Sequence, residues 1–389
     1  MRIVHIITRM IVGGAQENTL LTCEGLHRRG HDVLLVTGPQ TGPEGSLLGE
    51  ACSYGYEVVV LHSLVREVNP LLDWRCLGEL RDLLARFRPV VVHTHSSKAG
   101  ILGRVAAHDV GTPCIVHTIH GMSFNRTQSR PVQAVYRALE QHASAYTDHF
   151  VTVAEAMKRQ AIEAGIAEPA KFTTVYSGIR TEWFDPARYD AQAVRRRWGF
   201  APEHIVVGTI ARMAPNKGYE YLIPAMKAAA RQEPRLRFVW IGDGENRSEY
   251  ERRLVEGGIR DRVYLVGLIL PNAIPKMLAG VDMLVHPSEW EGLARTLVQA
   301  LLMARPVISF DIDGAPEVVF PGRTGELVPL GDVEGLTRAM LTLASDADLR
   351  ARYGGAGRAL CLERFDQQRM VDQIVEVYQR ISPKRIAVL

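Results

Sequence analysis

Short apolar runs alternate with longer amphipathic segments along most of this chain. The runs are rich in Val and Ile and are continuous, which is typical of strands that are buried on both faces of a parallel sheet. In the first half of the chain they cover residues 2–7, 32–37, 57–61, 90–95, 114–120 and 149–153. Helical patterns lie between them, for example at 15–29, 73–87 and 97–108. The alternation predicts an α/β fold with helices on both faces of a parallel sheet.

A second series of the same kind begins after residue 203. Its apolar runs cover 204–211, 237–242, 262–267, 282–287 and 306–310. Residues 178–203 separate the two series and carry Gly, Pro and aromatic residues without clear periodicity. We therefore predict two Rossmann-like, doubly wound domains at 1–180 and 181–363, followed by a segment, 364–389, that begins with a helix at 364–381. Ligands of such sheets bind beyond the carboxyl ends of the strands, so two facing sheets predict one cleft between the domains.

Composition fits this picture and narrows the function. The chain has 389 residues, which suits two domains, and a formal net charge of +3 without a long basic run. A nucleic-acid partner is therefore not expected. The cysteines lie far apart and form no Cys-x-x-Cys pair, which argues against a zinc site and for a reducing compartment. Without a signal-peptide pattern or an apolar run that could span a bilayer, we expect a cytoplasmic protein, with association at a membrane surface left open.

A Gly-Gly pair follows the first strand, in the segment MIVGGAQENTL (10–20). Gly13 and Gly14 allow the backbone to approach a ligand closely, and the helix expected from about Ala15 offers N–H groups at its positive end. This arrangement suits a phosphate group, although a plain strand-to-helix turn has the same pattern. The dinucleotide motif Gly-x-Gly-x-x-Gly is absent.

Two cationic residues follow the first strand of the second series, in GTIARMAPNKGYEYLI (208–223). Arg212 lies at a strand end and Lys217 just before a helix, where both could neutralise a pyrophosphate leaving group without a metal ion. A solvated surface is the alternative. A further Gly-rich turn, IGDGENRSEYERRL (241–254), contains Gly244, which serves either phosphate binding or tight packing.

Several histidines and two aspartates raise the question of a metal. His93 and His95 form a His-x-His pair, but no acidic ligand is near in sequence, so hydrogen-bonded histidines are the favoured interpretation. Asp311 and Asp313 form an Asp-x-Asp at the start of a turn, which we interpret as a polar loop. His120 ends a strand and precedes a glycine, so it is better placed to meet a ligand.

The segment HPSEWEGLARTLVQA (286–300) places an acid, a glycine and an amide after an apolar strand. The carboxylate of Glu291 can accept hydrogen bonds from sugar hydroxyls, and Gly292 and Leu293 offer backbone N–H groups for a phosphate. Gln299 lies about two helical turns later on nearly the same face and could reach a second ring, such as a ribose. This describes a sugar-nucleotide pocket. A capped surface helix with an acid in its first turn is the alternative.

In order along the chain, the segments VGGAQE, HTHSSKAG, HTIHG, VYSGI (175–179), GTIARMAPNKGYEYLI, IGDGENRSEYERRL, HPSEWEGLARTLVQALLMARPVI and DGAPEVV resemble the retaining glycosyltransferases of family 4, which have the GT-B fold. The resemblance implies that the first domain binds the acceptor and that the second binds the sugar nucleotide. It also implies a last helix that returns to the first domain.

For individual residues, the resemblance implies that Arg212 and Lys217 hold the diphosphate and that Gly14 meets it from the other domain. It also implies that Glu291 binds a donor-sugar hydroxyl, that His120 lies near the donor sugar, and that no divalent metal or other cofactor is needed. We expect Gln16, His95 and Lys98 on the acceptor side. One departure stands out: the family pattern has Glu where this chain has Gln299, and the amide would weaken nucleotide binding by about 1–2 kcal/mol.

The expected reaction is transfer of a glycosyl group, with retention, from a UDP-sugar or another nucleotide diphosphate sugar to an acceptor hydroxyl. A saccharide or lipid-linked acceptor in cell-surface polysaccharide or glycolipid assembly would suit the resemblance. A sugar-nucleotide epimerase and a catalytically silent sugar-nucleotide-binding protein are the alternatives. Phe124, Arg126, Arg130, Tyr136 and Arg137 form either a membrane-surface patch or a solvated face.

Overall fold

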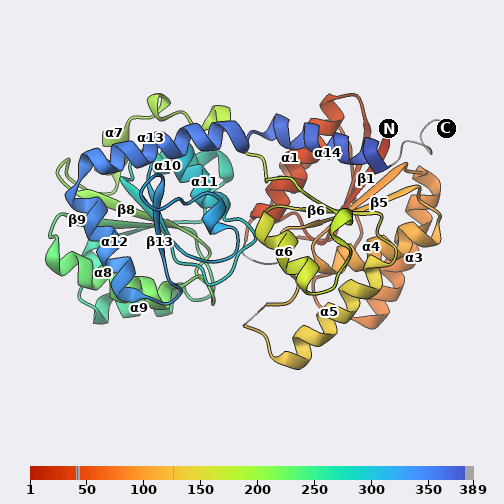
Figure 1. Cartoon of the computed structure of the whole chain (residues 1–389), viewed down its shortest axis with the longest axis horizontal. Coiled ribbons are helices and arrows are strands. Elements are labelled where there is room, and N and C mark those ends of the chain that lie inside the picture. The colour runs from red at the N-terminus through yellow and green to blue at the C-terminus, as the bar shows by residue number, and fades with distance from the viewer. Residues whose placement is uncertain (41, 43, 126, 382–389) are drawn as a thin grey trace. The chain divides into compact units, whose positions relative to one another are not determined.

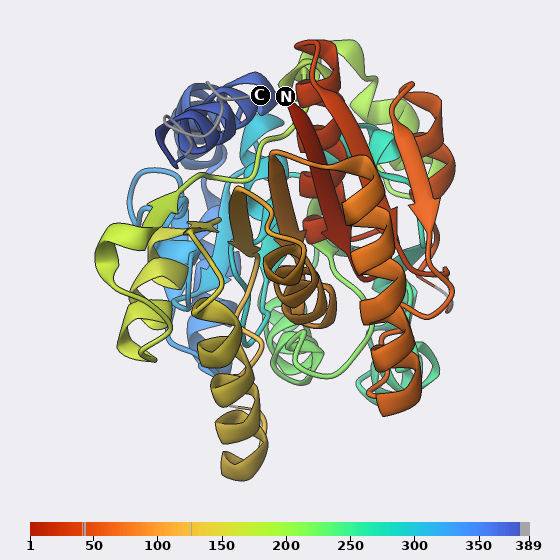
Figure 2. The ribbon, with the colours of Figure 1, turned by 90° about the vertical axis from the view of Figure 1, so that its right-hand side faces the viewer.

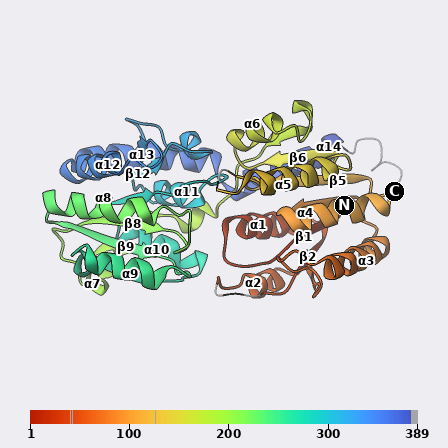
Figure 3. The ribbon, with the colours of Figure 1, turned by 90° about the horizontal axis from the view of Figure 1, so that it is seen from below.

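A computed structural model describes residues 1–40, 42, 44–125 and 127–381. The chain divides into two compact units: Met1–Ile179 together with Gln367–Ile381, and Arg180–Asp366 (Figure 1). The breaks lie beside the boundaries expected at 180/181 and 363/364. Each unit is a parallel sheet with helices on both faces (Figure 3). Within the described residues, no helix combines the length and the apolar character needed to cross a bilayer.

The N-terminal unit contains a seven-stranded parallel sheet in the order β3-β2-β1-β4-β5-β6-β7. Its strands are β1 Arg2–Ile7, β2 Asp32–Thr37, β3 Glu57–Val60, β4 Val91–His95, β5 Cys114–Ile119, β6 His149–Thr152 and β7 Phe172–Thr174. Its helices are α1 Gly14–Arg28, α2 Leu48–Ser53, α3 Pro70–Phe87, α4 Ser97–Asp109, α5 Arg130–Ser144, α6 Glu155–Glu163 and α14 Gln367–Ile381. Helices α3, α4 and α5 lie on the near side of the sheet in Figure 2.

The two faces of this sheet carry separate apolar clusters, because successive side chains of a strand point to opposite faces. Val4 and Ile6 of β1 pack with residues of α3 and α4. Ile3 and Ile7 of the same strand pack with α1 and with α14, the last helix of the chain. Helix α14 approaches α1 closely, since a Cβ atom on Gly25 would lie 2.5 Å from Cγ2 of Val371. The last helix therefore belongs to the N-terminal unit.

The C-terminal unit contains a six-stranded parallel sheet in the order β10-β9-β8-β11-β12-β13. Its strands are β8 Ile205–Ile210, β9 Leu236–Ile241, β10 Val263–Gly267, β11 Met283–His286, β12 Val307–Phe310 and β13 Gly325–Val328. Its helices are α7 Ala191–Arg197, α8 Tyr219–Gln232, α9 Arg247–Glu256, α10 Ile274–Ala279, α11 Arg295–Leu302, α12 Val333–Ser345 and α13 Ala347–Arg364. Its core is built around the fully buried Trp240 and Phe310.

Strands β7 and β13 and helices α7, α12 and α13 were not predicted from the sequence. Strand β7 has the sequence FTT and strand β13 has GELV, and both lie at sheet edges. Neither carries the long apolar run that marks a central strand. Helix α7 lies inside the segment that shows no clear periodicity. Three consecutive arginines at 195–197 make this segment look like a polar loop, although the helix buries Val194.

Candidate functional site

In the C-terminal unit, the loops that follow β8 and β11 meet at the carboxyl edge of the sheet. The N–H of Glu289 donates to the carbonyl of Asn216 at 3.0 Å. A Cβ atom on Gly218 would lie 1.8 Å from the carbonyl oxygen of Pro287, and Gly218 has a positive φ of 72°. Only glycine fits there. This close approach brings Lys217 beside the segment that contains Glu291.

Lys217 and Glu291 form an ion pair at the centre of this site. Nζ of Lys217 lies 2.5 Å from Oε1 of Glu291, and the two side chains are 27% and 25% exposed. His286, at the end of β11, places Nε2 at 3.6 Å from the same oxygen, while its Nδ1 bonds Oγ1 of Thr296 at 3.2 Å. Burial alone would raise the pKa of Glu291, but the charge of Lys217 and the contact with His286 hold it well below its ordinary value. Glu291 is therefore a carboxylate over the whole physiological range.

The loop that carries Glu291 is fixed from the other side by the loop after β12. The N–H of Glu291 donates to Oδ2 of Asp313 at 2.8 Å, and the N–H of Gly314 donates to the carbonyl of Gly292 at 3.1 Å. Asp313 has a positive φ of 46°. The second residue of the Asp-x-Asp pair thus holds a loop in place, which is the polar-loop role that we favoured over a metal site.

Several donors at the start of α11 are available to a ligand. Among the residues that the structure describes, the N–H groups of Gly292 and Leu293 have no hydrogen-bond acceptor. They precede an eight-residue helix whose positive end favours an anion. Gln299 lies on this helix, is 5% exposed, and its side-chain amide makes no hydrogen bond to the described part of the chain. This set suits a phosphate with a neighbouring hydroxyl group.

Arg212 lies in the same loop as Lys217, and Gly244 lies in the loop between β9 and α9, which packs against it. Arg212 follows β8 and is exposed. Gly244 packs tightly against this loop, since a Cβ atom on it would lie 2.4 Å from the carbonyl oxygen of Met213. Its own N–H donates to Oδ1 of Asp243 at 2.8 Å. The packing therefore explains this glycine without a phosphate, whose binding here stays a prediction.

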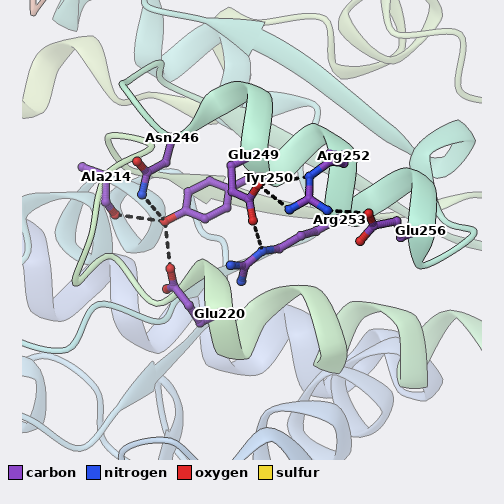
Figure 4. A network of polar contacts seen from close by, with 8 residues as sticks. All are labelled: Ala214, Glu220, Asn246, Glu249, Tyr250, Arg252, Arg253 and Glu256. Atoms are coloured by element: carbon purple, nitrogen blue, oxygen red, sulfur yellow. Dashed lines mark hydrogen bonds and ion pairs between the residues drawn. The ribbon is translucent and has the colours of Figure 1, made fainter.

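A buried phenol supports the loop that carries Arg212 and Lys217 (Figure 4). Oη of Tyr250, on α9, lies 3.3 Å from the carbonyl oxygen of Ala214 and 3.0 Å from Oε1 of Glu220 on α8. Its third partner is the amide of Asn246 at 3.1 Å. Burial raises the pKa of Tyr250 to about 12, so the phenol keeps its proton. The loop is thus held at its middle by a hydroxyl that two helices fix.

In the N-terminal unit, the Gly-Gly pair opens α1. Gly13 is the N-cap, without a side-chain hydrogen bond, and Gly14 is exposed at the first helical position. The first N–H groups of a helix have no partner within it. Gln16 folds back toward the cap, because a Cβ atom on Gly13 would lie 2.6 Å from its Oε1. The turn can present N–H groups to an anion, as the sequence pattern predicts.

The predicted histidines form a buried chain at the end of β4 and β5. Nε2 of His120 lies 3.0 Å from Nδ1 of His95, and Nε2 of His95 lies 2.9 Å from Nδ1 of His5 on β1. His120 is partly exposed, whereas His95 is fully buried and cannot contact an acceptor substrate directly. His95 can therefore affect a bound acceptor substrate only indirectly, through its hydrogen bond to His120.

Lys98, the other residue expected on the acceptor side, lies in the first turn of α4. Its Nζ is 2.6 Å from Oδ1 of Asp73 on α3 and also donates to the carbonyl of Glu67. Its side chain is only 11% exposed. The charge of Lys98 is therefore used to join α3 and α4, and contact with an acceptor stays a prediction.

Two family models match the chain. The model described as Glycosyltransferase Family 4 matches residues 12–183, and the model described as Glycosyl transferases group 1 matches residues 204–346. Between them they cover the strands of both sheets except β1. The chain is a family 4 glycosyltransferase.

Relatives of this glycosyltransferase agree with the assignment. It is 29% identical over 381 residues to UDP-Gal:alpha-D-GlcNAc-diphosphoundecaprenol alpha-1,3-galactosyltransferase of Escherichia coli, covering 97% of this chain and 96% of the relative. It is 22% identical to the capsular polysaccharide biosynthesis glycosyltransferase CapM of Staphylococcus aureus, covering 91% of each chain. Among solved structures, Anabaena HepE in complex with UDP-glucose superposes with a TM-score of 0.82 at 22% identity, covering 98% of this chain and all (100%) of that one. The fold is GT-B.

Sequence reasoning missed residues of the glycosyltransferase that the structure brings to these sites. The sequence pattern indicates only that His286 ends a strand, yet its side chain contacts Glu291. His5 and Tyr378 lie far from the histidine pair in sequence, and the sheet and α14 bring them to it. The available signal was a polar residue inside an apolar strand or helix face, since such a residue needs a buried partner.

Proposed function

We propose that this glycosyltransferase transfers a sugar, with retention, from a UDP-sugar to an acceptor hydroxyl. The observation that carries the proposal is the cluster of Lys217, Glu291 and His286 beside the N–H groups of Gly292 and Leu293. A carboxylate for sugar hydroxyls next to cationic and N–H groups for phosphate matches the two halves of a sugar nucleotide. The relatives support the choice of base, because one is named for UDP-Gal and a solved neighbour holds UDP-glucose.

Each residue has a distinct part in this proposal. Glu291 accepts hydrogen bonds from hydroxyls of the donor sugar, and Lys217 and Arg212 stabilise the diphosphate. The N–H groups at the start of α11 bind a phosphate oxygen, and Gln299 contacts the ribose. Because cationic side chains and N–H groups neutralise the leaving group, no metal or other cofactor is required.

The reaction breaks the bond between C1 of the sugar and the phosphate oxygen, and forms a bond from C1 to the acceptor oxygen on the same face. The proton of the acceptor hydroxyl passes to the departing phosphate oxygen, so UDP leaves with that proton. Glu291 is paired with Lys217 and holds the sugar, so it is not the nucleophile. Lys217 gains importance as negative charge grows on the leaving diphosphate.

For the acceptor, we propose a lipid-linked saccharide in the assembly of a bacterial surface polysaccharide or glycolipid. The name of the Escherichia coli relative contains a diphosphoundecaprenol acceptor, and CapM is named for capsule biosynthesis. The protein would then work in the cytoplasm, in contact with the membrane surface. Helix α5 offers apolar contact to a membrane, because Val132, Val135 and Leu139 are exposed on one side of it, and Arg130 and Arg137 are exposed elsewhere on the same helix. The predicted patch residue Arg126 lies outside the described residues.

The test is a reaction series with the purified full-length protein, a panel of UDP-sugars and GDP-sugars, and a short-chain polyprenyl diphosphate saccharide, with and without EDTA. The proposal predicts acceptor-dependent release of UDP in EDTA and a product with the anomeric configuration of the donor, read by NMR. Conversion of a UDP-sugar to its epimer without an acceptor would support the epimerase instead. Binding of UDP without transfer or slow hydrolysis would support a silent binding protein.

A further inference from the structure

A row of polar groups crosses one face of the N-terminal sheet where its neighbours are apolar. His5 lies opposite His93 in the pairing of β1 with β4, and His95 lies opposite Thr118 in the pairing of β4 with β5. These side chains share the face that α14 covers, and Tyr378 of α14 reaches them. All are buried, so each must find its hydrogen-bond partners inside the protein.

The partners form one continuous chain that ends at His120. Oγ1 of Thr118 and Oη of Tyr378 each lie 2.6 Å from a nitrogen of His93, Nε2 and Nδ1 respectively. Oη of Tyr378 also lies 3.4 Å from Nε2 of His5. From His5 the chain continues through His95 to Nε2 of His120, by the contacts of 2.9 Å and 3.0 Å described above.

The imidazoles inside this chain are neutral. Burial lowers the pKa of His5 to about 3, and burial also holds the pKa values of His93 and His95 well below the ordinary value. A neutral imidazole carries one N–H and one acceptor nitrogen. Each ring therefore donates on one side and accepts on the other, so the whole chain has only two arrangements, which run in opposite directions.

One arrangement satisfies every proton and the other does not. If Thr118 donates to His93, the protons run from His93 to Tyr378, then to His5, His95 and His120, and each finds an acceptor. In the reverse arrangement His93 donates to Thr118, and the threonine hydroxyl needs an acceptor of its own. Within the described part of the chain, Oγ1 of Thr118 has no hydrogen-bond partner besides His93. A buried hydroxyl proton without an acceptor is unfavourable, so the first arrangement is preferred.

We propose that Thr118, His93, Tyr378, His5 and His95 act as positioning residues that fix His120 as the Nδ1–H tautomer, so that His120 presents a hydrogen-bond donor to an oxygen of the substrate. In this tautomer, Nε2 of His120 accepts the hydrogen bond that Nδ1–H of His95 donates. The substrate group that such a donor recognises is a hydroxyl or phosphate oxygen. That last step rests on the proposed function, whereas the tautomer itself does not.

A metal site is the rival explanation for the same histidines. One nitrogen from each of His5, His93 and His95 lies within 4.8 Å of the others, which a metal ion could use. Both nitrogens of all three rings are, however, hydrogen-bonded to a neighbour in the chain. An ion would have to break those bonds, so the structure favours the chain.

The experiment is long-range ¹H–¹⁵N NMR of histidine imidazoles in the full-length protein, without substrate. The wild type is expected to show His120 as the Nδ1–H form, although histidine in water favours Nε2–H. Tyr378→Phe and Thr118→Val each keep the packing but remove one hydroxyl of the chain, and each is expected to convert His120 to a mixture of tautomers. Tyr56→Phe is the control, because Tyr56 is 5% exposed in the same unit and its hydroxyl makes no hydrogen bond to a described residue.

Three results would overturn the proposal: an Nε2–H tautomer of His120 in the wild type, an unchanged tautomer in both variants, or imidazole shifts that show the rings binding added Zn²⁺. Loss of transfer from UDP-sugars with the Nδ1–H tautomer intact would count against the proposed function alone. If both proposals hold, turnover falls in Tyr378→Phe and Thr118→Val in proportion to the lost Nδ1–H population. Turnover of Tyr56→Phe then stays at the wild-type level.

Discussion

At the scale of single residues, the proposed mechanism depends on the contact between the carboxylate of Glu291 and the ammonium group of Lys217. The ion pair of Lys217 and Glu291 holds both side chains ready before a substrate arrives. His286 and Asp313 hold the carboxylate and its backbone from other sides. A substrate then meets groups that need little rearrangement, which is the usual source of electrostatic stabilisation in enzymes.

Lys217→Ala is expected to lower turnover at least about tenfold, because the lost charge stabilises the diphosphate most as it leaves. Steady-state assays at saturating donor measure this. Lys276→Ala is the matched control, since Lys276 is an exposed lysine on α10 of the same unit. Equal turnover in the two variants would remove Lys217 from the mechanism.

Glu291→Gln is expected to change how stability depends on pH. The folded-state pKa of Glu291 lies well below the ordinary value of 4.5, so its ionised form stabilises the fold at pH values above 4.5. That contribution is lost as the pH falls through the lower, folded-state pKa. The wild type should therefore melt at a higher temperature than the variant at pH 7, with a smaller difference at pH 4. A difference that stays constant with pH would show that the carboxylate is not stabilised by its neighbours.

At the scale of elements, strands and helices position the residues of the site, and some helices also expose side chains that could contact a membrane. The central strands and the helices between them could be predicted from the sequence, because a continuous apolar run or a helical period is a property of neighbouring residues. The edge strands β7 and β13 could not, since their sequences, FTT and GELV, lack the continuous apolar run that marks the other strands. The same holds for Gly218, whose need for a positive φ follows from a loop that is distant in sequence.

Helix α14 is expected to depend on Gly25 of α1. In Gly25→Ala the new Cβ atom would lie 2.5 Å from Val371, and such overpacking costs about 1–3 kcal/mol of the free energy of unfolding. Gly78→Ala on α3 is the control, because a Cβ atom there meets nothing within 4 Å and alanine favours the helix. Urea unfolding followed by circular dichroism measures both. Gly25→Ala as stable as Gly78→Ala would contradict the packing of α14 on α1.

Helix α5 is expected to bind membranes that contain anionic lipid. Val135 is 59% exposed on this helix, so Val135→Asp should weaken flotation with phosphatidylglycerol vesicles by removing apolar contact and adding repulsion. Val255→Asp is the control, because Val255 is 64% exposed on α9 of the other unit. If the wild type does not float, or if both variants float equally well, α5 is a solvated face.

At the scale of the whole molecule, the fold and the class of reaction followed from the order of short motifs along the chain. The family resemblance correctly predicted a GT-B glycosyltransferase. The sequence also indicated which residues could bind a sugar nucleotide, but not how they are supported. His286 acts on Glu291 across a turn, and Tyr378 reaches the histidines from the last helix after the chain has passed through the second unit. Such support depends on three-dimensional neighbours that carry no local pattern.

The central claim is that one cluster in the C-terminal unit binds both the sugar and the diphosphate of the donor without a metal ion. Isothermal titration calorimetry in the presence of EDTA tests this most directly. UDP and the UDP-sugar donor are each titrated into the wild type, Lys217→Ala and Glu291→Gln. The account predicts that Lys217→Ala weakens both ligands by about tenfold or more, corresponding to about 1.4 kcal/mol. It predicts that Glu291→Gln weakens only the UDP-sugar and leaves UDP as tight or tighter, because the change leaves the charge of Lys217 unopposed. Binding that needs Mg²⁺, or equal losses for both ligands in Glu291→Gln, would contradict it.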